Sequence, residues 1–113
     1  MRFPGGSNNT VSHKYGGNQI MDKIIPEITK EGFTYFDWNV DSSDATETCK
    51  DKGAIFNSVM NGVQGKEHAI ILMHDAAAKT STVEALPQIV DGLRKKGFVF
   101  KKITEETPHV QFK

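Results

Sequence analysis

The chain has 113 residues, enough for one hydrophobic core and too few for two domains of ordinary size. Its fourteen basic and fourteen acidic residues cancel, and no basic stripe with interleaved aromatics occurs, which argues against a nucleic-acid partner. One cysteine, Cys49, excludes an internal disulfide. No stretch approaches the roughly 20 apolar residues of a membrane span, and the polar N-terminus lacks the apolar core of a signal peptide. We therefore expect a soluble, cytoplasmic chain without a membrane segment.

The first third of the chain predicts a loop followed by a helix. Residues 2–17 are rich in glycine, asparagine and serine, which is typical of a loop. Apolar residues then recur at helical spacing over residues 18–31, with Asn18 as the expected N-cap and Gly32 as the stop. Pro26 is expected to bend this helix or to end its first turn.

The middle of the chain predicts strand, helix and strand. An aromatic and β-branched run over residues 33–40 favours a strand. A helix is expected over residues 45–64, ending near Gly65. Its buried face should contain Cys49, Phe56, Val59 and Val63. Residues 69–73 are apolar on both faces, which is typical of a central parallel strand covered by helices.

A third helix is expected from about Ser81, because Ser81 and Glu84 have the spacing of a capping box, and Gly97 should end it. Its buried face should contain Val83, Leu86, Ile89 or Val90, and Leu93. Residues 98–100 predict a last strand, and residues 104–113 a loose polar tail.

Strands that alternate with helices predict an α/β fold with a parallel sheet and right-handed crossovers. We expect one partial domain over residues 1–113, with a glycine-rich loop at 1–17, an α/β body at 18–103 and the tail at 104–113. In this arrangement the loops after the strands meet at one edge of the sheet. Polar residues that follow the strands are therefore candidates for a shared site.

His74 follows the apolar residues of the central strand directly, so its imidazole should lie at the strand end, partly facing a cleft. Histidine suits proton transfer near neutral pH. Asp41 and Asp44 follow the preceding strand, and a carboxylate beside an imidazole would hold the ring in one orientation. The alternative is structural, since Asp41, Asp44 and Asp75 could simply cap turns or helices.

The segment from Arg2 to Gly6 combines a planar cation with a backbone that can approach a ligand closely. A guanidinium can grip a carboxylate, and N–H groups of a glycine turn can stabilise an oxyanion. The alternative is an ordinary glycine-proline loop. Trp38 could stack on a sugar ring, although aromatic residues within a strand more often belong to a core. The other three histidines show no spacing that indicates a metal site.

Taken in order, three segments resemble signature motifs of the polysaccharide deacetylase family, also called the NodB-homology or carbohydrate esterase family 4 domain. R-F-P-G-G-S-N-N at 2–9 resembles its third motif, W-N-V-D-S-S-D at 38–44 its fourth, and I-L-M-H-D at 71–75 its fifth. The resemblance implies the C-terminal part of a distorted (β/α) barrel. It also implies metal-dependent removal of acetyl groups from polymers such as chitin or peptidoglycan, with zinc or cobalt as the usual kind of metal.

The resemblance assigns roles to individual residues. His74 resembles the general acid that protonates the departing amine, and Asp44 the carboxylate that charges and orients it. Arg2 resembles the arginine that positions the catalytic-base aspartate, and the N–H of Gly5 would face the oxyanion. Leu72 would line the acetyl pocket, together with Pro4 and Trp38. Two positions depart from the family pattern: Gly5 stands where an aromatic residue is frequent, and Ala45 where a tryptophan often stands.

The family's first motif, T-F-D-D-G, and its second, H-[ST]-x-x-H, do not occur in these 113 residues. They carry the base and metal ligands, so we expect no bound metal and little activity from this chain alone. The missing N-terminal half, or a second copy docking on an exposed sheet edge, is the expected partner. Family members usually work outside the cytoplasm. The alternative from another class is a non-catalytic α/β module that binds saccharide or protein.

Overall fold

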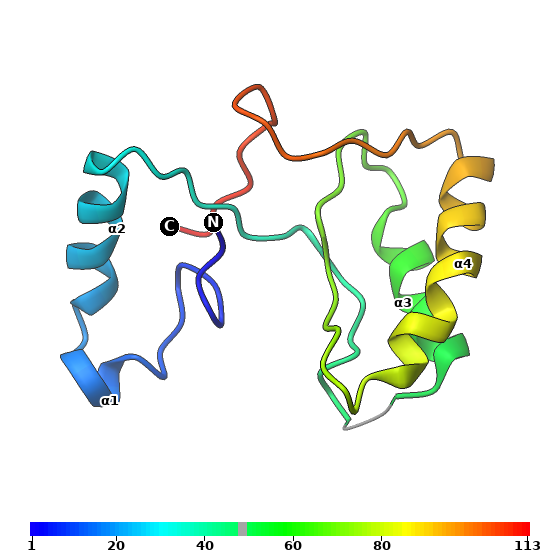
Figure 1. Cartoon of the computed structure of the whole chain (residues 1–113), viewed down its shortest axis with the longest axis horizontal. Helices are drawn as coiled ribbons and strands as arrows, with labels where there is room; N and C mark the ends of the chain where they lie inside the picture. Colours follow the sequence, from blue (N-terminus) through cyan, green and yellow to red (C-terminus); the bar gives the residue numbers. More distant parts are fainter. Residues whose placement is uncertain (48–49) are drawn as a thin grey trace. The chain divides into compact units, whose positions relative to one another are not determined.

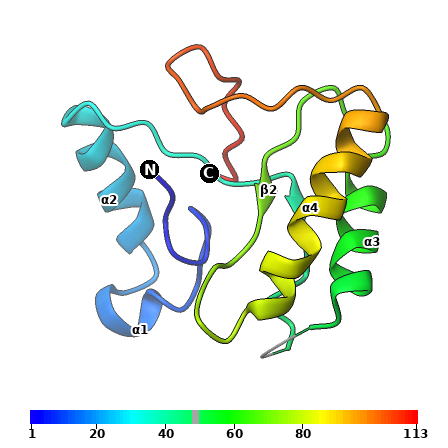
Figure 2. The same ribbon diagram turned by 45° about the vertical axis from the view of Figure 1, so that its right-hand side comes forward.

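The computed structural model describes residues 1–47 and 50–113, and the chain divides into two compact units. The first unit comprises Met1–Asp37 and Pro108–Lys113, and the second comprises Trp38–Thr107. The regular elements, in chain order, are α1 (His13–Gly16), α2 (Ile20–Lys30), β1 (Val40–Asp41), α3 (Lys52–Gly62), β2 (Ile71–Leu72) and α4 (Thr80–Lys95). Figure 1 labels the four helices along the chain, and Figure 2 also labels β2.

The first unit is built around α2. This helix begins after Gln19, whose side chain makes no capping hydrogen bond, so the prediction of Asn18 as N-cap was wrong by one residue. Pro26 lies inside the helix, which continues past it, and Gly32 ends the segment with a φ of 92°. The apolar face of α2 packs in a small core formed by Phe3, Met21 and Tyr35 with Ile20, Ile24, Ile25 and Ile28.

The predicted strand at 33–40 was wrong except for its last residue, which belongs to β1. Within the first unit, the N–H of Phe36 donates to Met1 and that of Asp37 donates to Val110. In the second unit, the N–H of Val40 donates to Ile70. A strand requires a ladder with one neighbour, whereas these donors are bound by three separate segments.

The C-terminal segment Pro108–Lys113 belongs to the first unit and is not loose, contrary to the prediction for the tail. The side chain of Gln111 donates to the carbonyl of Tyr35 at 3.1 Å, and the Tyr35 hydroxyl donates to the carbonyl of Lys113. The N–H of Phe112 donates to the carboxylate of Asp37 at 2.7 Å. Sequence patterns missed this attachment because its partners lie more than 70 residues away along the chain.

In the second unit, β1 and β2 pair in parallel, with Val40 opposite Ile71 and Asp41 opposite Leu72. This confirms the predicted parallel sheet with helices between its strands. The side chain of Asn39 fixes the register, because its amide donates to the His68 carbonyl at 2.8 Å and its oxygen accepts from the Ile70 N–H at 2.7 Å. Of the predicted strand at 69–73, two residues have strand pairing, and both are partly buried.

Helix α3 begins at Lys52, seven residues later than predicted. Asp51 caps it by accepting a hydrogen bond from the N–H of Ala54 at 3.2 Å. The backbone of Asp51 itself, with φ −54° and ψ 132°, lies outside the helical region, so the helix does not extend back through it. Further back, the Thr46 N–H closes a turn onto the carbonyl of Ser43, whose φ is 62°. The predicted helical position of Cys49 lies outside the described residues.

Helix α4 begins at Thr80 after Lys79, so the predicted capping box of Ser81 and Glu84 was wrong. The predicted buried face was also partly wrong, because Val83 is 59% exposed and Leu86 is 44% exposed. The face that is buried contains Ser81, Thr82, Ala85, Ile89 and Leu93. Ile89 and Leu93 confirm part of the prediction, and Gly97 follows the helix with a φ of 92°.

Helices α3 and α4 lie side by side (Figures 1 and 2). The core that they form with the strands contains Val40, Ile55, Val59, Met60, Val63, Ala85, Ile89 and Leu93. The predicted strand at 98–100 was wrong: the Phe98 N–H caps α4 by donating to Leu93, and Val99 is 77% exposed. No helix within residues 1–47 and 50–113 is long and apolar enough to cross a membrane.

Candidate active site

The structure brings Asp44 and His74 into direct contact in the second unit. Asp44 lies in the turn after β1, and His74 lies two residues beyond the end of β2. Carboxylate Oδ1 of Asp44 is 2.8 Å from ring Nδ1 of His74, and Oδ2 accepts the backbone N–H of His74, also at 2.8 Å. Since β1 and β2 are parallel neighbours, the segments that follow them leave the sheet at the same edge.

The Asp44 side chain is fully buried and its oxygens are bound by donors. Burial alone would raise the pKa of this carboxyl group. The hydrogen bonds from the ring and backbone of His74 and from the Thr82 hydroxyl outweigh burial, and the pKa of Asp44 lies below its usual value. Asp44 is therefore an ionised carboxylate held beside an imidazole.

The ring of His74 is partly open to solvent, with 42% of the side chain exposed. Because Nδ1 faces the Asp44 carboxylate, Nε2 is the ring nitrogen left to exchange a proton with a bound molecule. The pair has the geometry of a general acid or base whose ring orientation is fixed by a buried carboxylate.

The loop that carries Asp44 is anchored to the start of α4. The Lys79 ammonium donates to the carbonyl of Asp44 at 2.8 Å and to that of Glu47 at 2.6 Å. Asp41, the other aspartate of the predicted pair, is exposed and accepts the N–H of Ser43 at 2.8 Å. Asp41 therefore caps a turn, while Asp44 is the aspartate that meets His74.

In the first unit, Gly5 and Gly6 have φ values of 73° and 85°, a region that L side chains rarely adopt. The side chain of Asn9 holds this loop by donating to the carbonyls of Pro4 and Gly6 at 3.2 and 3.1 Å. A Cβ added at Gly5 would lie 3.0 Å from that of Asn9. The loop therefore has a backbone shape that depends on glycine.

The glycine loop ends on a buried pair, Ser7 and Asp37. The N–H of Ser7 donates to Oδ1 of Asp37 at 2.8 Å, and its hydroxyl donates to Oδ2 at 2.6 Å. Both side chains are fully buried, and the Ser7 hydroxyl oxygen also accepts the N–H of Lys113 at 3.1 Å. Arg2 is exposed, and its guanidinium donates to the carbonyl of Asp37 at 3.5 Å.

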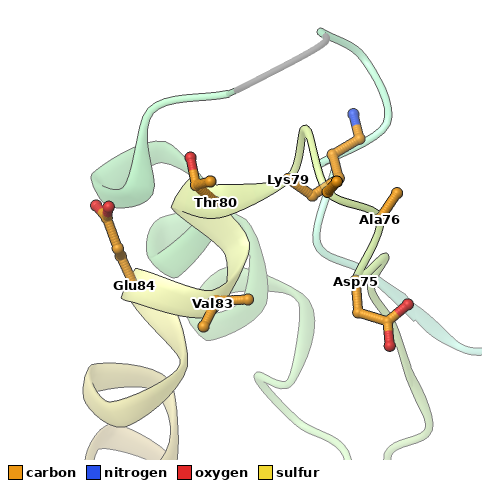
Figure 3. A pocket seen from close by; sticks show the side chains of 7 residues that line it. Asp75, Ala76, Lys79, Thr80, Val83 and Glu84 are labelled. Atoms are coloured by element: carbon orange, nitrogen blue, oxygen red, sulfur yellow. The ribbon is translucent and has the colours of Figure 1, made fainter.

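The residues predicted to line an acetyl pocket lie in different environments. Leu72 in β2 and Trp38 are partly buried, and Pro4 is exposed in the first unit. None of these three residues lines the depression of 350 Å³ in the second unit, which begins at Asp75 directly after His74 (Figure 3). The depression is lined by residues of the following loop and the start of α4: Asp75, Ala76, Ala77, Lys79, Thr80, Val83 and Glu84.

Of the predicted site residues, the structure thus joins Asp44 and His74. Arg2, Gly5 and Pro4 lie in the first unit, and their roles, like those of Leu72 and Trp38, stay predictions. Thr82 and Lys79 were missed. A threonine and a lysine at a helix start carry no distinctive pattern, and the only available signal was their position after the segment that contains His74.

No group of three or more histidine, cysteine, aspartate or glutamate residues within the described ranges 1–47 and 50–113 is placed to hold a metal ion. The donor set around Asp44 explains why this carboxylate is unsuited to such a role, because hydrogen-bond donors already occupy both of its oxygens. The metal centre that the sequence resemblance implies for a complete domain therefore stays a prediction.

No protein-family model matches the chain. YheN of Bacillus subtilis (strain 168), which is assigned to the polysaccharide deacetylases, is 35% identical over 103 residues, covering 85% of this chain and 34% of that protein. A peptidoglycan-N-acetylglucosamine deacetylase of Bacillus cereus (strain ATCC 14579) is 31% identical over 84 residues, covering 72% of this chain and 30% of that protein. The chain thus spans about a third of these relatives.

Two solved structures are similar to the chain in fold as well as in sequence. The catalytic domain of peptidoglycan N-acetylglucosamine deacetylase from Eubacterium rectale ATCC 33656 aligns with a TM-score of 0.92 and 34% identity, over 100% of this chain and 50% of that one. The polysaccharide deacetylase Bc1974 from Bacillus cereus aligns with a TM-score of 0.66 and 28% identity, over 88% of this chain and 48% of that one.

Proposed function

The chain is a relative of the polysaccharide deacetylases and has the α/β fold of part of their NodB-type domain, and on this premise we propose that it supplies the general-acid side of a deacetylase site. The substrate would be an acetylated amino-sugar polymer of the peptidoglycan or chitin type. The contact between Asp44 and His74 is the observation that carries this proposal.

In the proposed reaction, His74 donates a proton from Nε2 to the nitrogen that leaves the acetyl carbon. The ionised carboxylate of Asp44 keeps Nδ1 protonated and offsets the positive charge of the ring. Because Asp44 is fully buried, water does not screen this pair from one side. The partly exposed ring can still reach a polymer, which could not enter a closed cavity.

The other roles follow the motifs of the family. Arg2 would position the aspartate that acts as base, and the N–H of Gly5 would stabilise the oxyanion. Leu72, Pro4 and Trp38 would surround the acetyl group. The glycine conformation at Gly5 supports the oxyanion role, because a backbone N–H can approach a ligand closely where no Cβ intervenes.

The base and the metal ligands of the family lie in motifs that are not among these 113 residues. In a complete site, a divalent metal would supply the activated water, and the described residues of this chain contain no group of three or more histidine, cysteine, aspartate or glutamate side chains placed to bind one. We therefore propose that this chain alone releases little acetate and that a complementary half-domain completes the site.

Acetate release from an N-acetylglucosamine oligomer tests the proposal. The chain is assayed with zinc or cobalt, first alone and then with the separately produced half of the Eubacterium rectale domain that this chain does not match. Acetate is expected in the mixture and not from either half. His74→Asn in the mixture should lower the rate by a factor of about 10² or more, since general acid catalysis contributes about 10²–10⁴.

Three results would count against this function. Metal-dependent turnover by the chain alone would show that it holds a complete site. An unchanged rate in the His74→Asn mixture would exclude the general-acid role. Glycan binding by the chain without metal, together with no acetate in any mixture, would favour a binding module.

A further inference from the structure

Thr82 lies in the first turn of α4 and reaches the buried carboxylate of Asp44. Its hydroxyl donates to Oδ2 at 2.9 Å, and the same oxygen accepts the N–H of His74 at 2.8 Å. Two donors thus bind Oδ2, while Oδ1 faces the ring of His74. Thr82 is 5% exposed, so water does not compete readily for this hydroxyl.

We propose that Thr82 is a positioning residue for the general acid: its hydroxyl fixes the rotation of the Asp44 carboxylate so that Oδ1 stays directed at Nδ1 of His74. This inference rests on the proposed function, because a fixed ring matters for a histidine that delivers a proton. Thr82 touches neither ring nor substrate in this role and acts through Asp44.

Lys79 and His74 also bind Asp44, but neither fixes the rotation of its carboxylate as Thr82 does. The Lys79 ammonium binds the backbone carbonyls of Asp44 and Glu47, so it holds the loop and not the carboxylate oxygens. His74 itself contributes its backbone N–H to Oδ2, but its other contact, at Oδ1, comes from the ring whose orientation is to be fixed. The hydroxyl of Thr82 is a donor independent of that ring.

The burial of Thr82 supports a hydrogen-bonding role for its side chain. Sequence rules place an apolar residue on the buried face of a helix, yet α4 buries Thr82 while Val83 is 59% exposed. A buried hydroxyl needs a partner, and the Asp44 carboxylate satisfies it. The helix is therefore rotated so that a hydrogen-bond donor, and not a methyl group, faces the carboxylate.

Two substitutions separate the effect of the Thr82 hydroxyl from the effect of the side-chain volume. Thr82→Val keeps the branched volume and removes the donor, whereas Thr82→Ser keeps the donor. In the full chain, nitrogen-15 NMR reads the tautomer of the His74 ring, and carbon-13 NMR follows the titration of the Asp44 carboxyl. Thr82→Val is expected to raise the carboxyl pKa and to lower the population of the tautomer with a proton on Nδ1. Thr82→Ser should restore both readouts.

An unchanged tautomer and an unchanged carboxyl titration in Thr82→Val would overturn the proposal. If that variant does not fold, Thr82→Ala provides the same comparison without the branched methyl groups. These readouts need no turnover, so they are separate from the acetate assay. In the half-domain mixture, Thr82→Val should lower kcat by a smaller factor than His74→Asn and leave KM unchanged. A change in KM alone would also overturn it.

Discussion

The carboxylate of Asp44 contacts His74 twice, through the ring at Nδ1 and through the backbone N–H of the same residue, with both distances at 2.8 Å. One contact sets the direction of the ring, and the other ties the chain after β2 to the loop after β1. The pair is therefore part of the fold as well as of the candidate site. A change at Asp44 should alter stability even without a substrate.

Asp44→Asn should make the second unit less stable at neutral pH by about 1.5–3 kcal/mol, the usual size of a hydrogen bond to a charged group. The folded-state pKa of Asp44 lies below its usual value, because hydrogen bonds from His74 and Thr82 outweigh its burial. Its contribution is thus present above the unfolded pKa of about 4 and is lost as pH falls through the folded pKa. The stability difference between wild type and variant should shrink in that acidic range.

Urea unfolding at a series of pH values, followed by the fluorescence of Trp38, measures this difference. Trp38 is the single tryptophan of the chain and lies in the second unit. Asp91→Asn, which removes one exposed carboxylate from α4, is the control. A constant difference between wild type and Asp44→Asn across the acidic range would contradict the link between Asp44 ionisation and folding.

The pairing of Asp44 with His74 could be anticipated from the sequence, because residues after neighbouring parallel strands meet at one edge and both lie in recognisable motifs. The length of the strands was overestimated. Residues 33–39 have the composition of a strand, but their donors are bound by separate segments. Composition reports which residues suit a strand, and it cannot report which neighbour supplies the ladder.

Asp37→Asn should loosen the glycine loop and the C-terminal segment together. The buried carboxylate accepts from the N–H and hydroxyl of Ser7 and from the N–H of Phe112. An asparagine amide would direct its own donors at one of these groups, at a cost of about 2 kcal/mol. Hydrogen exchange at the Ser7 and Phe112 amides should therefore be faster in the variant.

Asp22→Asn is a matched control for this change. Its carboxylate pairs with the ammonium of Lys113 at 2.8 Å, but its side chain is 61% exposed. An exposed ion pair contributes between about 0 and 1 kcal/mol. Equal acceleration of Ser7 exchange in both variants would show that the buried carboxylate has no special role in the first unit.

Gly62→Ala tests the contact between α3 and β1. A Cβ at this position would lie 2.6 Å from Cγ1 of Val40, a stiff β-branched side chain in the core. Overpacking of about 1–3 kcal/mol should exceed the gain in helix propensity of about 1 kcal/mol. We expect a lower urea midpoint.

Gly92→Ala provides the comparison for Gly62→Ala. Its Cβ would lie 3.1 Å from Sδ of Met60, whose flexible side chain can move aside. Gly92→Ala should therefore be less destabilising than Gly62→Ala in the same unfolding experiment. The reverse order would show that Val40 yields more easily than Met60.

The orientation of α4 shows where sequence reasoning failed and why. Apolar periodicity selected Val83 and Leu86, whereas the structure buries Thr82 and Ala85, one position earlier in each case. Ile89 and Leu93 belong to the predicted and to the observed buried face, so the apolar pattern alone could not decide between the two orientations of the helix. One contact of the buried face, between Thr82 and Asp44, joins residues 38 positions apart and leaves no mark in a local pattern.

Truncation of single side chains on α4 distinguishes the two orientations. Ile89 is 1% exposed within the core of the second unit, so Ile89→Ala should cost about 2–5 kcal/mol. Leu86 is 44% exposed, and Leu86→Ala should stay near the surface range of about 0.5 kcal/mol. Urea unfolding monitored through Trp38 gives the loss of stability for each of the two variants. If Leu86→Ala costs as much as Ile89→Ala, the helix is rotated toward the apolar pattern, and Thr82 cannot then reach Asp44.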